Sequence, residues 1–263
     1  MKIEQLHEEQ LRQLTGCRYA TLRALHQALL AAEPARARGR PLKQTLWVML
    51  VVTLIKLRLD MPYRAIEIMV RLDAVTIHRY VQRIVSALSA LALKPETGAP
   101  LKGFLIVDST GTRVRSTDLK DHSGHKHHKR RKCQAVVTED REIVSVSRAF
   151  AGSVHDKRIW NEVFCATKPE RLVLADKGYV GAKGEDEVLL RPYKRSDVAY
   201  KADKERAKAF NRSLSKIRVT VEHVFAQMKA FRVLSNLLPF HPDRYGEVFA
   251  AVAVIHNYSL RCR

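Results

Sequence analysis

Apolar residues in the first third of the chain recur with the period of an α-helix. This spacing links Leu22, Leu25, Leu29 and Leu30. After a basic segment marked by glycine and proline at residues 35–41, residues 45–59 are apolar on most of their helical surface. A helix of that kind is typically buried among its neighbours. The pattern therefore predicts a helical bundle at this end of the chain.

A short helix and a longer helix are expected next. Pro62 suits the first turn of a helix over residues 63–70, because its missing N–H has no partner there. Asp73 is a preferred capping residue for a second helix over residues 74–93. A short helix, a tight turn and a longer helix form the order of a helix-turn-helix.

In a helix-turn-helix, the start of the second helix reads base edges in the major groove of DNA. The residues at that position are Val75, Thr76, His78 and Arg79, with Arg83 nearer the phosphate backbone. The alternative is an ordinary αα-hairpin inside a helical bundle, since the turn carries no glycine. The net charge of the chain favours the DNA-binding interpretation.

The pattern changes after the turn-rich segment KPETGAP at residues 94–100. Short runs typical of β-strands cover residues 104–107, 133–138, 143–150 and 171–175. Helical patterns start after Asp156 and cover residues 201–214, 217–234 and 243–260. Strands followed by mixed strands and helices predict an α/β layered domain. We therefore expect a helical DNA-binding domain over residues 1–95 and a second domain over residues 101–263.

Composition changes the picture mainly through charge. The 263 residues include 47 Lys and Arg against 27 Asp and Glu, a formal net charge of +20. Such an excess favours a polyanionic partner, and double-stranded DNA is the natural one. A membrane is not expected, because the most apolar segment, residues 45–59, is too short to span a bilayer and contains Lys56 and Arg58. Without a signal-like opening segment, a cytoplasmic, nucleoid-associated location is predicted.

Three acidic residues are candidates for catalysis. Asp108 follows the apolar run FLIV, Asp176 follows RLVLA, and Glu222 lies on an amphipathic helix near Arg218 and Lys229. Each acid alone has an ordinary interpretation, as a turn cap or as a surface ion pair. Together they can converge at one edge of a sheet, where three carboxylates suit Mg²⁺, with Mn²⁺ as a substitute. Two such ions can activate a nucleophile and stabilise the leaving oxygen of a phosphodiester.

The motifs around these acids resemble a known family. They are VDSTG at Asp108, ADKGYVG at Asp176 and R-x3-E-x6-K from Arg218 through Glu222 to Lys229, with GSVHD at 152–156 and RPYK at 191–194. In this order they resemble the DDE-superfamily insertion-sequence transposases of bacteria.

The resemblance implies an RNase-H-like α/β fold, a mixed sheet flanked by helices, preceded by an all-α helix-turn-helix domain. It implies that Asp108, Asp176 and Glu222 are catalytic residues and ligands of two Mg²⁺ ions. It also implies a transposase that binds terminal repeats, cleaves and joins DNA strands, and assembles as a homodimer or larger complex on DNA. Arg218, Lys229 and Lys177 would then bind phosphates near the scissile bond.

A segment rich in histidine and basic residues lies at 121–134. A zinc site is conceivable, but the histidine spacing matches no closed set with cysteines. The preferred interpretation is a basic hairpin that contacts DNA phosphates through Lys126, Lys129, Arg130 and Arg131. Asp156 is expected at a helix start, either as a cap or in support of the metal ligands.

Two alternatives to a transposase remain open at this point. One is a DNA-binding regulator derived from a transposase, in which the second domain has no catalytic role. The other is a domesticated endonuclease that no longer transposes. The three acids argue against the regulator, and terminal inverted repeats beside the gene would separate the endonuclease from a transposase.

Overall fold

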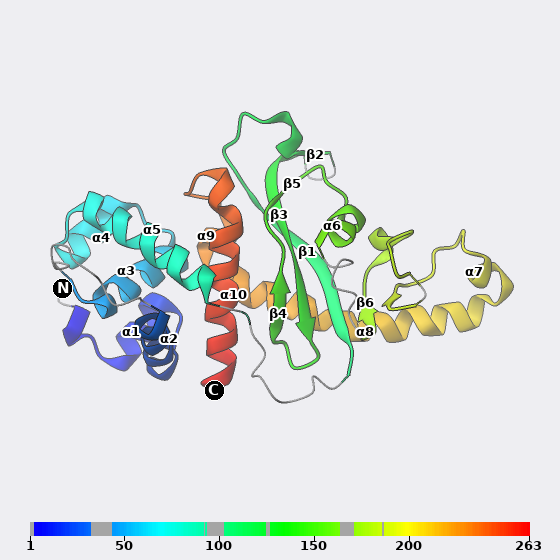
Figure 1. Ribbon diagram of the computed structural model, residues 1–263, viewed down its shortest axis with the longest axis horizontal. Coiled ribbons are helices and arrows are strands. Elements are labelled where there is room, and N and C mark those ends of the chain that lie inside the picture. The colour runs from blue at the N-terminus through cyan, green and yellow to red at the C-terminus, as the bar shows by residue number, and fades with distance from the viewer. Residues whose placement is uncertain are drawn as a thin grey trace. The chain divides into compact units, whose positions relative to one another are not determined.

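The computed structural model describes residues 3–32, 44–91, 93, 103–124, 127–163, 171–185 and 187–263. The chain divides into two compact units (Figure 1). The helical unit contains residues 1–93 and 228–263, and the sheet unit contains residues 94–227. Residues 228–263, which the sequence pattern placed with the second domain, thus pack with the N-terminal helices. The functional roles of the two predicted domains stay predictions.

The helical unit is built around α3. Its elements are η1 (Ile3–Gln5), α1 (Glu8–Thr15), α2 (Tyr19–Ala32), α3 (Leu46–Leu59), α4 (Tyr63–Val70), α5 (Ala74–Ala90), α9 (Arg232–Ser235), η5 (Pro242–Arg244) and α10 (Tyr245–Arg261). Helix α3 packs against α1, α2, α5 and α9, as expected for a helix that is apolar all round. Its one deeply buried cation, Lys56, is satisfied by the Asp60 carboxylate at 2.9 Å and the Met61 carbonyl at 2.9 Å.

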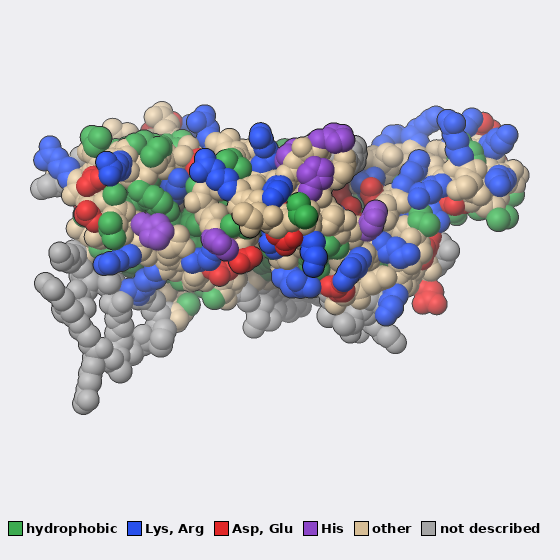
Figure 2. Space-filling view, turned by 90° about the horizontal axis from the view of Figure 1, so that it is seen from above, with side chains coloured by type: hydrophobic (Ala, Val, Ile, Leu, Met, Phe, Trp, Pro, Cys, Tyr) green, Lys and Arg blue, Asp and Glu red, His purple; other side chains and the backbone are tan. Residues whose placement is uncertain are grey.

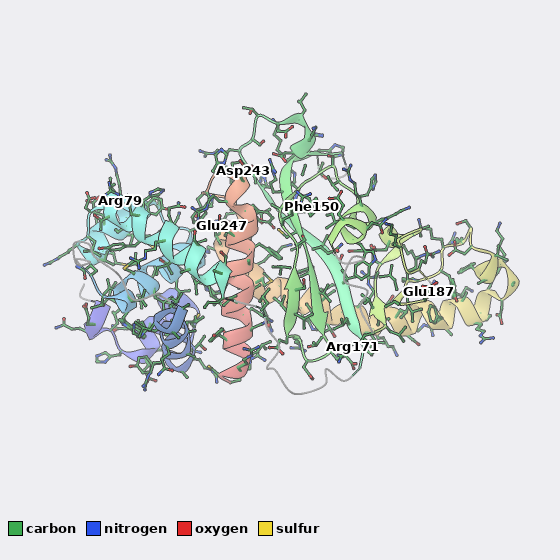
Figure 3. All side chains as sticks on the ribbon, viewed as in Figure 1. Arg79, Phe150, Arg171, Glu187, Asp243 and Glu247 are labelled. Atoms are coloured by element: carbon green, nitrogen blue, oxygen red, sulfur yellow. The ribbon has the colours of Figure 1, made fainter. Side chains whose placement is uncertain are left out.

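Helix α10 joins the helical unit because it has two apolar faces to cover. Its sequence, YGEVFAAVAVIHNYSLR, buries ten residues, and it packs against α5 and α2. Polar contacts fix the same position, since Ser86 on α5 donates a hydrogen bond of 3.0 Å to Glu247, labelled in Figure 3. The long sequence separation of these partners explains why a linear pattern placed residues 243–260 elsewhere.

The two predicted helices at residues 63–70 and 74–93 are present as α4 and α5. Asp73 caps α5 by accepting hydrogen bonds from Val75 N at 3.0 Å and Thr76 N at 3.1 Å. The turn between the helices contains no glycine because Arg71 takes the left-handed conformation itself, with φ of 57°. Helix α5 ends at Ala90, three residues before the predicted end.

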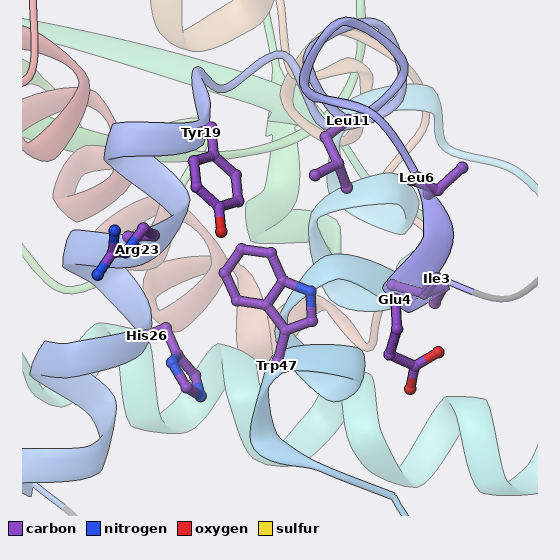
Figure 4. Close-up of a pocket in the computed structure, with 8 residues that line it drawn as sticks. All are labelled: Ile3, Glu4, Leu6, Leu11, Tyr19, Arg23, His26 and Trp47. Carbon is purple, nitrogen blue, oxygen red and sulfur yellow. The ribbon is translucent and has the colours of Figure 1, made fainter.

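A cavity of about 320 Å³ opens beside Trp47 in the helical unit (Figure 4). The rings of Tyr19 and His26 stand edge-on to Trp47, with centroids 5.8 Å and 5.6 Å away. Burial lowers the pKa of His26, which disfavours the charged imidazolium. Glu4 is the single carboxylate among the described residues that line this cavity.

The sheet unit contains a mixed, seven-stranded sheet. Its strands are β1 (Leu105–Arg113), β2 (His122–Ser123), β3 (His128–Thr138), β4 (Ile143–Val146), β5 (Phe150–Ala151), β6 (Val173–Leu174) and β7 (Leu189–Leu190). The main order is β2-β3-β1-β6-β7, and β4 and β5 also pair with β3. β1 is antiparallel to β3 and parallel to β6, and β6 is parallel to β7. An antiparallel group extended by parallel strands is consistent with the expected RNase-H-like fold.

Helices flank this sheet. They are α6 (Asp156–Val163), α7 (Val198–Ala202) and α8 (Lys204–Lys229), with the 3₁₀ turns η2 (Leu119–Asp121) and η4 (Lys177–Tyr179). A core cluster joins β1, β3, β6 and β7 to Trp160 of α6 and Tyr179 of η4. The predicted helices at 201–214 and 217–234 are instead mainly one helix, α8, because no glycine or proline interrupts the chain between them.

Two strand predictions also differ from the structure. The run 143–150 is divided into β4 and β5, and only two residues of the run 171–175 form a strand. Within the described ranges, none of the helices has the length and apolar character needed to cross a membrane.

Candidate active site

Asp108 on β1 and Asp176, two residues after the end of the parallel strand β6, occupy equivalent positions relative to this strand pair. The pairing of β1 with β6 sets Ile106 opposite Leu174. Asp108 and Asp176 each follow two residues later, and the backbone is still extended at Asp176, with φ −88° and ψ −178°. Side chains alternate with period two along an extended chain. Both carboxylates therefore lie on the face of the sheet that carries the side chains of Ile106 and Leu174. The register of the sheet therefore brings the two acids together.

The prediction that the first strand ends at Val107 is wrong. β1 continues to Arg113 because β3 pairs with it along its whole length, with Asp108 opposite Ala135. On the other side, the pairing with β6 stops after Ile106. Asp108 thus lies inside a strand, at the point where its neighbour β6 has ended. Such a position holds the carboxylate rigidly and leaves room beside it for the chain that carries Asp176.

The surroundings of the Asp108 side chain disfavour its charged carboxylate form. Its side chain is 22% exposed, and one oxygen lies 3.9 Å from the Arg218 guanidinium. The other oxygen accepts a hydrogen bond of 2.7 Å from the Ser109 N–H. Burial raises the pKa of Asp108 to about 6, and Asp176 and Asp156 add to the rise, while Ser109 and Arg218 oppose it. Like charges gathered in a partly buried place are typical of a cation site.

The turn after β6 orients Asp176. Its carboxylate accepts a hydrogen bond of 2.7 Å from Gly178 N and so caps η4. A Cβ at Gly178 would lie 2.9 Å from that same carboxylate oxygen, so a larger residue there would require the Asp176 side chain to move. Lys177 lies between them and is exposed to solvent, so it is available to an anionic ligand.

The glycine of the motif VDSTG also has a steric role. A Cβ at Gly111 would lie 2.7 Å from the carbonyl oxygen of Arg131 on β3. Real Cβ contacts are almost never that short. Gly111 therefore permits the close approach of β1 and β3 that extends the strand beyond Asp108.

Asp156 is a third carboxylate close to this place. It is the first residue of α6, as the sequence predicted, and its charge contributes to the raised pKa of Asp108. Its own partner is Lys132 on β3, whose ammonium lies 2.9 Å from the carboxylate. Asp156 therefore begins a helix and also adds a negative charge near the candidate ligand Asp108.

Two polar residues that sequence reasoning missed are buried beneath these acids. Gln134 on β3 donates hydrogen bonds to the Tyr179 hydroxyl at 2.6 Å and to the carbonyl of Asp156 at 3.3 Å. Burial raises the pKa of Tyr179 well above its usual value, and the nearby carboxylates Asp156, Asp108 and Asp176 contribute. Tyr179 belongs to the motif ADKGYVG, whereas Gln134 carried only the weak signal of a polar residue in an apolar strand.

Helix α8 brings Arg218 to Asp108 but does not complete a metal site. Arg218 is 17% exposed and points its guanidinium at Asp108, whereas Glu222 lies one turn further along and is exposed. Within the described residues, no group of three His, Cys, Asp or Glu side chains is close enough to hold a metal ion. Lys229 ends α8 and belongs to the helical unit. Of the three predicted ligands, Asp108 and Asp176 thus lie near each other in the structure.

Comparison with known protein families assigns the chain to a family. The family model described as DDE superfamily endonuclease matches residues 107–257, more than half of the chain. The chain belongs to the DDE superfamily of endonucleases. The match begins at the strand residue before Asp108 and contains Asp176, Arg218 and Glu222.

Two curated relatives resemble this DDE endonuclease. A protein of Microchaete diplosiphon, assigned as a transposase for insertion sequence element IS702, is 29% identical over 155 residues, which are 59% of this chain and 55% of that protein. A protein of Streptomyces albus G, assigned as a transposase for insertion sequence element IS112, is 28% identical over 171 residues, 65% of this chain and 64% of that protein. The matches thus span between about half and two thirds of the relatives. No solved structure matches the chain.

The predicted basic hairpin of the DDE endonuclease is present, as β2 and β3, but its cations are engaged within the protein. Lys129 donates to the Ser116 carbonyl at 2.5 Å, and Arg130 donates to the Gly111 carbonyl. Arg131 lies 2.7 Å from the buried carboxylate of Asp121. Lys126 lies outside the described residues. Contacts of this hairpin with DNA remain a prediction, and the contacts within the protein give its cations a structural role.

The candidate base-reading residues lie on α5 of the helical unit. His78 and Arg79 are both exposed, and Arg79 projects away from the helix in Figure 3. The His78 ring stands edge-on to the Tyr63 ring of α4, with centroids 5.2 Å apart, and its Nε2 lies 3.1 Å from Gln82 Nε2. Arg83 is half-buried. Arg79 is therefore the candidate best placed to meet a partner.

Proposed function

We propose that this DDE superfamily member is a transposase that binds the terminal repeats of an insertion element and cleaves and joins DNA strands there. The observation that carries the proposal is the register of β1 and β6, which sets Asp108 and Asp176 each two residues beyond the paired Ile106 and Leu174, with Arg218 3.9 Å from Asp108. The names of the two curated relatives support the same reaction. In this proposal the sheet unit carries the chemistry.

The donor set fits divalent cations of the Mg²⁺ type. Carboxylate oxygens are the ligands that Mg²⁺ and Mn²⁺ prefer, and Mg²⁺ keeps some of its shell for water and substrate phosphate. Among the described residues, Asp108 accepts one hydrogen bond, from Ser109 N; burial raises its pKa to about 6, and the negative charges of Asp176 and Asp156 add to the rise. A cation would relieve that repulsion. Asp108, Asp176 and Glu222 would hold two such ions, which supply activation of a nucleophile and stabilisation of the leaving oxygen.

The residues around the acids have roles that follow from their chemistry. Arg218 presents a planar fork that can bind two oxygens of one phosphate, and it would turn from Asp108 to the scissile phosphate. Lys177 is exposed beside Asp176 and would bind a neighbouring phosphate as a point charge. Tyr179 and Gln134 form a buried hydrogen bond of 2.6 Å beneath the acids and would keep the Asp156 end of α6 in place.

The helical unit would recognise the element ends through α4 and α5, arranged as a helix-turn-helix. His78 and Arg79 are exposed near the start of α5, where this motif reads base edges. Val75 is 56% exposed and Ile68 is 83% exposed on the same pair of helices. Apolar side chains at such positions suit the methyl group of thymine. Cleavage of two ends in one reaction would use two or more copies of the protein.

Cleavage of duplex DNA that carries the ends of the element tests the proposal. The parent protein with Mg²⁺ or Mn²⁺ is expected to release 3′-hydroxyl ends at the terminal repeat and to join them to a second duplex. The Asp176→Asn variant is expected to bind the same duplex and not cut it. Sequence-specific binding by the parent without any cleavage would identify a regulator instead. Cleavage without strand joining would identify an endonuclease.

A further inference from the structure

The first half of α8 and the segment before it form a strongly basic surface far along the helix from Glu222. Residues 194–216 contain eight Lys or Arg residues against three acidic ones. Figure 2 shows Lys and Arg side chains gathered at the end of the sheet unit that α7 and α8 form. We call the exposed cations Lys204, Lys208, Arg212 and Lys216 the α8 ridge.

The opposite side of the same helix is packed, so the direction of the ridge is fixed. Ala207 and Leu214 are buried, and the Phe210 ring lies 5.0 Å from the Tyr193 ring. Asn211 holds the same loop through two hydrogen bonds, accepting from Tyr193 N at 2.7 Å and donating to Tyr193 O at 3.0 Å. A helix anchored on one face presents its other face to solvent in a defined orientation.

The acids of this region are already engaged, which leaves the ridge with an excess of positive charge. Asp197 pairs with Arg191 at 2.7 Å, and Glu205 pairs with Lys208 at 2.8 Å. Asp203 accepts a hydrogen bond of 2.9 Å from Arg206 N at the start of α8. In the part of the chain that the structure describes, Lys204, Arg212 and Lys216 make no ion pair.

The ridge and Glu222 share one rigid helix, so their separation can be calculated. Residues four apart differ by about 40° in direction and about 6 Å along the axis. Lys204 therefore points in the same direction as Glu222, and the four cations spread from there over about 120° of the exposed face. Along the helix axis they lie about 9 to 27 Å from Glu222. At about 3.4 Å per base pair, this distance corresponds to roughly 3 to 8 base pairs of a duplex.

We propose that the α8 ridge binds the phosphate backbone of duplex DNA about 3 to 8 base pairs from the phosphodiester bond that is cut. This inference rests on the proposed function and adds a second contact region to it. The ridge would recognise the charge of the DNA backbone and not its base sequence, because Lys and Arg on an exposed helix face contact phosphates without reaching base edges. The ridge would position the duplex, while Arg218 would hold the phosphate at the site.

Salt-dependent binding to duplex DNA without divalent cations tests the ridge. The triple variant Lys204→Gln, Arg212→Gln and Lys216→Gln is expected to lower the slope of log affinity against log salt by about 2.7, since each lost phosphate contact removes about 0.9. The matched single variants are Arg212→Gln on the ridge and Arg206→Gln about 120° away on the same helix. Arg212→Gln should lower the slope by about 0.9, Arg212→Lys should restore it, and Arg206→Gln should leave it unchanged.

A series of duplex lengths locates the contact. Duplexes that extend about 12 base pairs beyond the scissile phosphate on either side should separate the parent from the triple variant. Duplexes that end about 2 base pairs beyond it on the side that meets the ridge should bind both proteins equally. Shortening the element side and the flanking side in turn reveals which DNA the ridge contacts.

The outcomes separate this inference from the proposed function. If the parent cleaves and binds DNA, but the triple variant keeps the parent's salt slope on long duplexes, the ridge inference is wrong. It is also wrong if Arg206→Gln weakens binding as much as Arg212→Gln, because the effect would then be general charge. Absence of any DNA binding by the parent would remove the proposed function and the ridge with it. Thermal unfolding of each variant confirms that the exposed substitutions leave the fold intact.

Discussion

Two basic segments of the sheet unit have similar composition and different surroundings. In the β2–β3 hairpin, Lys129 and Arg130 donate to backbone carbonyls, and Arg131 lies 2.7 Å from the buried Asp121 carboxylate. On the α8 ridge, Arg212 and Lys216 are exposed and make no ion pair within the described ranges. The described hairpin cations thus have partners within the protein, whereas these two ridge cations are exposed.

This difference shows that the fold, and not the composition of a basic segment, decides which Lys and Arg residues already have partners within the protein. The hairpin run is the more conspicuous one in the sequence, yet its strand geometry directs these side chains to neighbouring segments. The ridge is interrupted by acids and small residues, but helical spacing places its cations on one face. Stability and binding measurements on matched pairs of variants can break or sharpen the comparison.

The largest expected effect is the loss of protein stability when a cation of the hairpin is replaced. Asp121 is 0% exposed, and Arg131, at 19% exposure, is its ion-pair partner. Arg131→Gln would leave a buried carboxylate without its counter-charge, which typically costs about 3–5 kcal/mol of unfolding free energy. Chemical denaturation of Arg131→Gln and of Arg212→Gln measures the contrast. Equal stability of the two variants would contradict a structural role for the hairpin cation.

A second prediction compares the Asp121 carboxylate, 2.7 Å from Arg131, with the Asp108 carboxylate, whose ion-pair partner Arg218 lies 3.9 Å away. Burial raises the pKa of Asp108 to about 6 from 3.8, so the unfolded chain loses this proton first and stability falls as pH rises from about 4 to 6. Asp108→Asn should therefore stabilise the protein at pH 7.5 by up to roughly 3 kcal/mol in the presence of a chelator.

The gain for Asp108→Asn should shrink as the pH is lowered towards 4, where the parent carboxyl is protonated as well. It should also shrink when Mg²⁺ is added, because a cation at the site stabilises the parent alone. Thermal unfolding across pH, with and without Mg²⁺, measures both trends. A variant less stable than the parent at pH 7.5 in chelator would mean that Asp108 is satisfied within the protein.

The smallest effect is expected on the ridge itself. Lys208 pairs with Glu205 at 2.8 Å, and both side chains are more than half exposed. An exposed pair of this kind contributes about 0–1 kcal/mol, so Lys208→Gln should change the unfolding free energy by less than about 0.5 kcal/mol. The same variant should weaken DNA binding at low salt. A large loss of stability would show that the ridge has a structural role like that of the hairpin.

The sequence predicted the elements whose ends are defined locally. Helix α5 begins after Asp73 because that carboxylate caps the next backbone N–H groups, and α4 follows Pro62. The buried helix α3 could also be predicted, since its apolar surface leaves no other environment. Such signals lie within a few residues of the element they define.

Features that depend on distant partners could not be predicted in the same way. β1 extends past Asp108 because residues 109–113 pair with residues of β3 that lie 17 to 25 positions later in the chain. The hydrogen bond between Gln134 and Tyr179 and the packing of α10 on α5 likewise join segments far apart in sequence. At the site, the register of β1 and β6 explains the meeting of Asp108 and Asp176, whereas the convergence of Glu222 stays a prediction.

The most direct test of the account is whether the three acids act as one catalytic unit. Single-turnover cleavage of end-containing DNA with Mg²⁺ would be measured for Asp108→Ala, Asp176→Ala, Glu222→Ala and the triple variant, with binding of the same DNA as the control. Groups that act together are strongly non-additive, so each single variant should bind DNA and fall to the same background rate as the triple variant. A Glu222→Ala variant that cleaves within about tenfold of the parent would contradict the assignment of Glu222 as the third acid.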